Sequence, residues 1–143
     1  MISLLDINVL MALSWANHPH HAAAHHWFNG HSVDGWATCL PTQTGVLRLS
    51  LNPQIVGVPM KGSEAVQLLR GLIAHPQHTY FVTLPELTHA DFEPLVRRLQ
   101  GYRQVSDAVL LAIAKQNQAQ FVTFDRAIET LCPWPNMVVV ITP

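Results

Sequence analysis

The sequence predicts a three-layer α/β sandwich around a central, mostly parallel β-sheet. Short apolar and β-branched runs alternate with segments of helical periodicity along the whole chain, and this alternation is typical of parallel α/β folds. Two of the apolar runs end directly in an aspartate. No repeat, low-complexity segment or long linker divides the 143 residues, so we expect a single domain spanning 1–143 with a substantial core.

Five apolar runs are the predicted strands. Each is short, rich in β-branched or aromatic residues, and bounded by Gly, Pro, Asp or a helical segment. The predicted strands are residues 2–5, 35–40, 80–83, 120–124 and 137–141.

The segments between these strands predict helices from their apolar spacing of three and four residues. They are 7–15, 20–28, 42–51, 63–73, 91–99, 107–117 and a short helix ending at Leu131. We expect Thr42 and Asp91 to be N-caps and Asn29-Gly30 to end the second helix. Residues 54–60 contain Gly57 and Pro59 and are predicted to form a loop.

Composition indicates a globular protein with partner surfaces. Hydrophobic residues make up 49% of the chain and charged residues only 12%, which suggests apolar surface that a partner covers. No apolar run reaches the ~20 residues that span a bilayer, and the N-terminus lacks the basic region of a signal peptide. We therefore expect a cytoplasmic protein in which Cys39 and Cys132 are free thiols.

The net charge of −1 excludes a broadly basic surface that coats nucleic acid. A protein of this charge that acts on nucleic acid must use a local site, a metal or a groove. Five histidines lie between His18 and His26, and His21 and His25 share one helix face. That spacing suits a transition metal, but no cysteine or carboxylate completes the set, so solvated or interface histidines are the favoured interpretation.

Three carboxylates occupy related positions. Asp6 and Asp125 each follow a predicted strand, and Asp107 lies in the first turn of a predicted helix. In a parallel sheet the carboxyl ends of the strands and the N-termini of the crossover helices meet at one edge, where ligands bind. The three acids can therefore converge, and a hard cation such as Mg²⁺ or Mn²⁺ would offset their repulsion and activate water. The structural alternative is that each acid only caps a helix.

Four segments in order resemble the PIN-domain family, and in particular the VapC-type toxins of prokaryotic toxin–antitoxin pairs. They are Leu4-Leu5-Asp6-Ile7-Asn8-Val9-Leu10, Gly45-x-x-Arg48 with Asn52-Pro53, Arg103 to Ala112 around Asp107, and Val122-Thr123-Phe124-Asp125-Arg126. The resemblance implies an endoribonuclease that requires Mg²⁺ or Mn²⁺, cleaves structured RNA such as tRNA or rRNA, forms a homodimer and is silenced by a cognate antitoxin.

Carried onto this sequence, the resemblance makes Asp6, Asp107 and Asp125 the catalytic and metal-binding acids, with Asp125 acting directly or through water. Asn8 and Thr123 would support them by hydrogen bonds. Gln43 stands where many PIN domains have a glutamate, so the site has one charge fewer and should hold metal less tightly; an ordinary polar role for Gln43 remains the alternative.

Arginines supply candidate phosphate contacts near these segments. They are Arg48, Arg103 and Arg126, each of which could equally serve in a surface ion pair. Arg97-Arg98 is better explained as a solvated helix face.

Two other classes of function compete. Gln43 favours a catalytically weak or silent PIN-like module that binds RNA or an antitoxin without cleaving. A phosphorylated receiver domain fits poorly, because Asp6 has no acidic neighbour and the only late lysine, Lys115, lies within a predicted helix.

Overall fold

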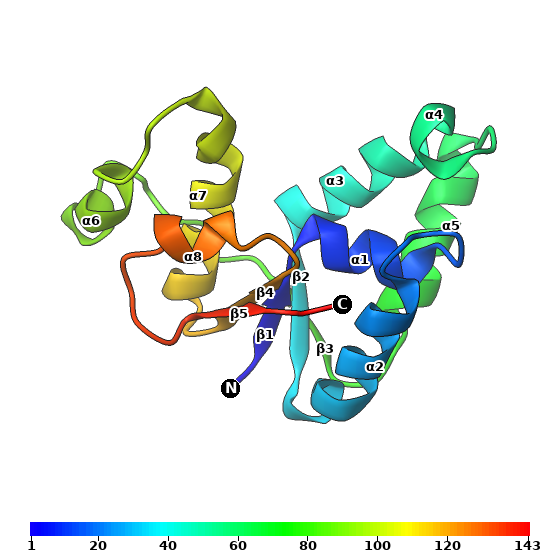
Figure 1. Ribbon diagram of the computed structural model, residues 1–143, viewed down its shortest axis with the longest axis horizontal. Helices are drawn as coiled ribbons and strands as arrows, with labels where there is room; N and C mark the ends of the chain where they lie inside the picture. The colour runs from blue at the N-terminus through cyan, green and yellow to red at the C-terminus, as the bar shows by residue number, and fades with distance from the viewer.

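Five parallel strands form one sheet at the centre of the molecule, in the order β3-β2-β1-β4-β5 (Figure 1). The computed structural model describes residues 1–143. The strands are β1 (Ser3–Leu5), β2 (Trp36–Cys39), β3 (His78–Phe81), β4 (Gln120–Thr123) and β5 (Val138–Val140). The predicted fold class is confirmed, and the sheet is parallel throughout.

Helices cover both faces of the sheet. They are α1 (Ile7–Ser14), α2 (His21–His31), α3 (Leu40–Ser50), α4 (Pro53–Val56), α5 (Gly62–Ile73), α6 (Glu93–Val96), α7 (Val105–Gln116) and α8 (Ala127–Leu131). Short 3-10 turns occupy Ser32–Asp34, Ala90–Phe92 and Tyr102–Gln104. In Figure 1 the helices α1 to α5 lie to one side of the sheet and α6 to α8 to the other. None of the helices combines the length and the hydrophobicity that a membrane-spanning helix needs.

Side-chain alternation along the strands divides the core in two. In β1, Leu4 packs with the α6–α8 layer and Leu5 with the α1–α5 layer, and Phe121 and Val122 divide in the same way in β4. Both strands are buried on both faces, which explains why their sequences are continuous apolar runs. Asp6, which follows Leu5, therefore leaves the sheet from a fully buried strand end.

The second helix is longer than predicted. Asn29 and Gly30 lie within α2, which continues to His31. The His31 ring stacks on Trp27 at 4.6 Å, and its Nδ1 donates to the Trp27 carbonyl at 2.7 Å. These contacts between residues one turn apart extend α2 past Asn29-Gly30, a pair that usually ends a helix.

Two predictions about the third helix are wrong. Cys39, not Thr42, is the N-cap, and Thr42 lies at the third helical position, where its hydroxyl accepts from the Cys39 backbone N–H at 2.9 Å. Most of α4 lies within the predicted loop 54–60. The Asn52 side chain accepts from the Gln54 N–H and caps this turn, and Gly57 ends it in a left-handed conformation.

The region from 78 to 99 also differs from prediction. Strand β3 begins two residues early, since His78 pairs with Trp36 and Phe81 with Cys39, while Val82 is 76% exposed. The predicted helix 91–99 is a 3-10 turn followed by the single turn α6, and His89, not Asp91, is the cap. Only Phe92 and Leu95 of this segment are buried and Leu99 is partly buried against the same cluster, so little apolar burial stabilises a longer helix.

Gly45 allows α3 to lie directly against the start of α1. A Cβ at position 45 would come 2.3 Å from Ile7 Cδ1 and 3.0 Å from Ile7 Cγ2. Because the branched Ile7 side chain has little rotamer freedom in a helix, it cannot easily turn away. The close approach of α3 therefore requires glycine.

We expect Gly45→Ala to lower the free energy of unfolding by about 1–3 kcal/mol through this overpacking, measured by denaturant titration. Gly71→Ala in α5 is the matched control, because nothing lies within 4 Å of its added Cβ. That control should stabilise the protein by up to about 1 kcal/mol through helix propensity. Equal effects of the two substitutions would contradict the role given to Gly45.

Candidate active site

Asp6 is a buried carboxylate at the carboxyl edge of the sheet. It follows β1, caps α1 and is only 7% exposed. Its backbone N–H donates to the Val122 carbonyl of β4 at 2.9 Å. Its Oδ1 accepts from the Ile7 N–H at 2.7 Å and its Oδ2 from the Thr123 hydroxyl at 2.7 Å. The helix-capping role predicted as the structural alternative is therefore present, but it uses only part of the carboxylate's acceptor capacity.

Thr123 connects the residues around Asp6. Its hydroxyl donates to Asp6 and accepts from the Asn8 side-chain amide at 3.3 Å and from the Asp125 N–H at 3.0 Å. One donor and two acceptor positions are all that a hydroxyl has, so its proton is directed to Asp6. Asn8 Oδ1 accepts in turn from the Phe124 N–H at 3.3 Å. Thr123 contacts Asp6 directly, and Asn8 contacts Thr123 and the backbone that follows it.

Asp107 reaches the same edge from the other layer. It is the third residue of α7 and is half-buried. The pKa of Asp6 is raised to about 6, mainly by burial and further by the charges of Asp107 and Asp125, despite the hydrogen bonds from Thr123 and Ile7. Burial, and then the charge of Asp125, also raises the pKa of Asp107. The three acids are therefore close enough to repel one another.

Asp125 has a second, structural contact. Its Oδ1 accepts from the Ala127 N–H at 2.9 Å at the start of α8, although Arg126 and not Asp125 is the N-cap of that helix. The side chain is exposed, and no hydrogen bond engages its second oxygen. Two hydrogen bonds therefore hold Asp125 in place, and its second carboxylate oxygen has no hydrogen-bond donor within the protein.

The atoms at this edge that could bind a metal ion are all oxygens, from carboxylates, an amide and a hydroxyl. Such a set fits Mg²⁺ or Mn²⁺ and does not suit a metal that prefers thiolate or imidazole. Nowhere in the protein do three His, Cys, Asp or Glu side chains stand ready to ligate one ion directly. A cation here would therefore be held by fewer than three direct carboxylate bonds and complete its shell with water, as Mg²⁺ usually does.

Gln43 is hydrogen-bonded to β2 and not to any of the three acids. Its Nε2 donates to the Thr38 hydroxyl of β2 at 3.0 Å, and that hydroxyl lies 2.8 Å from His78 Nε2 in β3. No hydrogen bond joins Gln43 to Asp6, Asp107 or Asp125. Thr38 is fully buried and was not predicted as a partner of Gln43. The sequence around a single threonine in a short strand does not indicate which side chain it will contact.

The three candidate arginines form no ion pair in the structure. Arg48 lines a groove between α3 and α7, Arg103 contacts the Tyr102 hydroxyl at 3.3 Å, and Arg126 is the N-cap of α8 beside Asp125. Arg97 and Arg98 have structural partners instead. Arg97 pairs with Glu93, and Arg98 donates to the carbonyls of Thr130 and Cys132.

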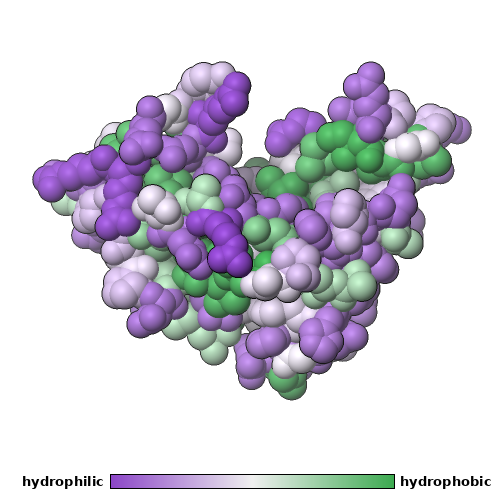
Figure 2. Space-filling model, viewed as in Figure 1, coloured by the Kyte–Doolittle hydropathy of each residue, from purple (hydrophilic) through white to green (hydrophobic).

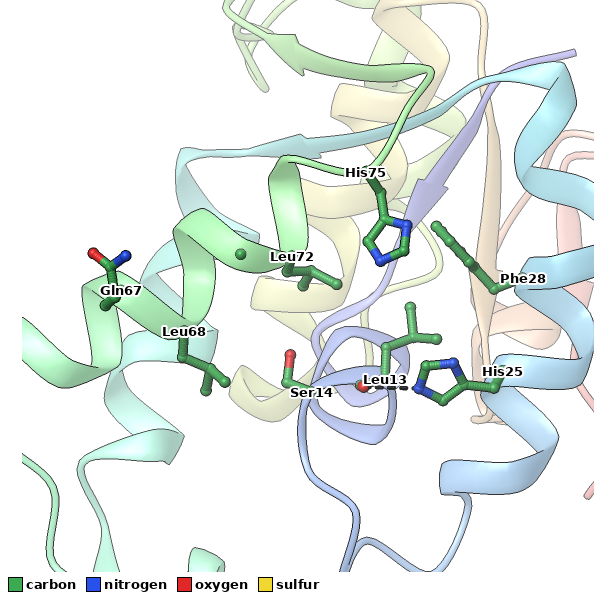
Figure 3. Close-up of a pocket in the computed structure, with 9 residues that line it drawn as sticks. Leu13, Ser14, His25, Phe28, Gln67, Leu68, Leu72 and His75 are labelled. Carbon is green, nitrogen blue, oxygen red and sulfur yellow. Dashed lines mark hydrogen bonds between the residues drawn. The ribbon is translucent and has the colours of Figure 1, made fainter.

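The histidine cluster joins helices. His21 Nδ1 donates to the Ala12 carbonyl at 2.7 Å and His25 Nε2 to the Leu13 carbonyl at 2.9 Å, at the C-terminal end of α1. Figure 3 shows the His25 ring bonded to Leu13 at the edge of a pocket that Phe28 and His75 also line. Each histidine of the i, i+4 pair thus uses one ring nitrogen in a hydrogen bond that joins α2 to the end of α1.

The fold and the edge acids define a class of protein. The model of the family described as PIN domain matches residues 3–132, and the chain belongs to this family.

Individual relatives within the family are ribonucleases of Mycobacterium tuberculosis. Ribonuclease VapC38 is 38% identical over 130 residues, which are 91% of this chain and 89% of that protein. Ribonuclease VapC39 is 36% identical over 135 residues, 90% of this chain and 91% of that protein. Ribonuclease VapC44 is 37% identical over 131 residues, 90% and 89% respectively. The resemblance to VapC-type proteins therefore extends over nearly the whole chain.

The buried charge of Asp6 should make Asp6→Asn more stable than the wild type at neutral pH in a chelating buffer. A carboxyl pKa raised from 3.8 to about 6 means that the folded state binds the proton more tightly than the unfolded state. The contribution of the Asp6 carboxyl to the free energy of unfolding is therefore fully present below pH 3.8, and it is lost as the pH rises through about 6. Ionised Asp6 then costs about 3 kcal/mol. We expect a gain of about 1–3 kcal/mol at pH 7.5 that shrinks toward pH 4, measured by denaturant titration.

Asp34→Asn is the control for this experiment, because Asp34 is an exposed acid in a 3-10 turn away from the site. It should change stability little at either pH. An Asp6→Asn protein that is less stable than the wild type at pH 7.5 would contradict the assigned electrostatic cost.

Proposed function

We propose that this chain is a ribonuclease toxin of a toxin–antitoxin pair, an endonuclease dependent on Mg²⁺ or Mn²⁺. The single observation that carries the proposal concerns Asp6 and Asp107 at one edge of the sheet. Burial and the charge of Asp125 raise the pKa of both carboxyl groups. Natural proteins rarely keep such a cluster without a cation to offset its charge. The relatives named ribonuclease support the same conclusion.

Asp6 and Asp107 are the residues that would hold the cation. Thr123 and Ile7 fix the orientation of the Asp6 carboxylate, and the helix start of α7 fixes Asp107. A bound divalent cation would polarise the scissile phosphate and lower the pKa of a bound water. Thr123 and Asn8 act by positioning, since they contact the carboxylate and the β4–Asp125 turn.

Asp125 and the arginines complete the proposed site. The free oxygen of Asp125 would accept a hydrogen bond from the attacking water, while its other oxygen stays bonded to Ala127. Arg48, Arg103 and Arg126 have no carboxylate partner and would contact RNA phosphates. Because the net charge is −1, binding would depend on this local site and not on a general basic surface.

The resemblance to VapC-type toxins extends the proposal to its partners. The substrate would be structured RNA such as tRNA or rRNA, in the cytoplasm, and a cognate antitoxin protein would silence the enzyme. A homodimer of one PIN-like domain, residues 1–143, would be the assembled toxin. Exposed apolar side chains, among them Ile55 and Val58 after α3, offer surface for such contacts.

A second candidate is a module that binds RNA or antitoxin without cleaving. Gln43 supports it, because this side chain brings no charge to the site and its amide is bonded to Thr38. Mn²⁺ added to purified protein with total RNA separates the two functions: cleavage that a chelator abolishes supports the nuclease, and RNA binding without cleavage supports the silent module.

Asp107→Asn should reduce metal-dependent RNA cleavage by roughly a hundredfold or more and remove cellular toxicity, because it takes away a charged metal ligand. Gel assays of cleavage with and without Mn²⁺ measure the first effect, and growth after induction measures the second.

Asp91→Asn is the matched control for Asp107→Asn, since Asp91 is exposed and only pairs with His89. It should cleave as the wild type does. Undiminished cleavage by Asp107→Asn would refute the assignment of Asp107 to the site.

Gln43→Glu should strengthen Mn²⁺ binding roughly tenfold, because it adds a negative charge to an edge that already gathers carboxylates. Isothermal titration measures the affinity. Gln54→Glu, on the exposed turn α4, is the control for the added charge. Equal affinity of the wild type and the Gln43→Glu protein would mean that position 43 does not face the metal.

A further inference from the structure

A groove of about 370 Å³ opens between α3 and α7. Figure 2 shows a notch in this region, between the lobe that carries α7 and the lobe that carries α3 and α4, with hydrophobic surface along the α3–α4 side. Apolar side chains form most of the groove's walls; they are Ile7, Leu40, Pro41, Val109 and Leu110. The volume lies in the range of small-molecule sites, about 300–1,000 Å³.

Three polar side chains also line the groove: Thr44 and Arg48 from α3, and Ser106 from α7. Neither hydroxyl takes part in a side-chain hydrogen bond within the protein, and Arg48 is in no ion pair. The groove therefore combines an apolar surface, two free hydroxyls and one free cation. Such a groove matches a ligand that has a flat aromatic ring with hydrogen-bonding groups at its edge and an attached anionic group.

The groove adjoins the proposed active site through two residues. Ile7 directly follows Asp6, and Ser106 directly precedes Asp107. The groove is therefore lined by the sequence neighbours of two site carboxylates. Gly45 allows α3 to lie directly against Ile7, which lines the groove.

We propose that this groove binds the unpaired base of the nucleotide next to the scissile phosphate, with Thr44, Ser106 and Arg48 as specificity-determining residues. The inference rests on the proposed ribonuclease function and adds to it a binding site for one particular nucleotide of the RNA substrate. The aliphatic walls contact the base faces, the hydroxyls of Thr44 and Ser106 contact the base edge, and Arg48 binds a flanking phosphate.

The base must be unpaired because only a base out of the stack can enter between two helices. Extracting a paired base costs a few kcal/mol, and least for a base that is already single-stranded. The groove thus selects loops within a structured RNA. A protein segment is the competing occupant, but the only charged residue that lines the groove is a cation, and the hydroxyls match a base edge better than an apolar peptide anchor.

The test uses a single-stranded oligoribonucleotide that the wild type cuts at one position, and the same oligonucleotide with an abasic site on either side of that position. The kcat/KM ratio of intact to abasic substrate isolates the contribution of the base. We expect a ratio of roughly 10 or more for the wild type at one of the two positions. In Thr44→Tyr, whose ring fills the groove, the ratio should fall to about 1.

Ser106→Ala tests the same site without added bulk and changes only an exposed hydroxyl. It should alter the order of preference among the four bases at that position. Thr88→Tyr, an exposed threonine in the loop before α6, is the control and should keep the wild-type ratio.

The outcomes separate this inference from the function on which it rests. A wild-type ratio near 1, or a ratio that Thr44→Tyr leaves unchanged, overturns the base site while cleavage itself upholds the nuclease. Loss of antitoxin binding in Thr44→Tyr with an unchanged ratio assigns the groove to a protein and also overturns it. No metal-dependent cleavage of any oligonucleotide by the wild type overturns both proposals.

Discussion

The hydrogen bond from the Thr123 hydroxyl to Asp6 Oδ2 is the contact on which the site depends. It joins the carboxyl ends of β1 and β4, which pair in parallel, and it orients a carboxylate that is 7% exposed. A buried acid with two acidic neighbours opposes folding. The fold tolerates this cost because the two strands are buried on both faces and their apolar core is large enough to offset it.

The two layers of helices contribute different parts of the site. The layer with α1 supplies Asp6 and Asn8, and the layer with α7 supplies Asp107. Asp125, in the turn after β4, lies between them and is fixed by its bonds to Thr123 and Ala127. A site assembled from several strand and helix ends keeps its geometry through the sheet, so surrounding loops can vary without moving the acids.

Gln43 shows how a single uncharged side chain changes such a site. The amide donates to Thr38, which a carboxylate could not do, and Thr38 in turn lies against His78. Gln43 is therefore part of a hydrogen-bond network between β2, β3 and α3 that includes none of the three acids.

The histidines at the C-terminal end of α1 also have a structural role, because their ring nitrogens bond to backbone carbonyls of α1 and so join α2 to α1.

The sequence by itself determined the alternation of strands and helices and the parallel sheet, because a change from a buried apolar run to helical spacing is a local signal. Asp6 and Asp125 stand where this change occurs. Tertiary structure alone decided the extent of α2, the register of β3 and the partner of Gln43. Each of these depends on a residue distant in sequence or on a packed ring, such as Trp36 opposite His78 or Trp27 against His31. The groove between α3 and α7 likewise exists only in the folded chain, because its walls come from helices that are distant in sequence.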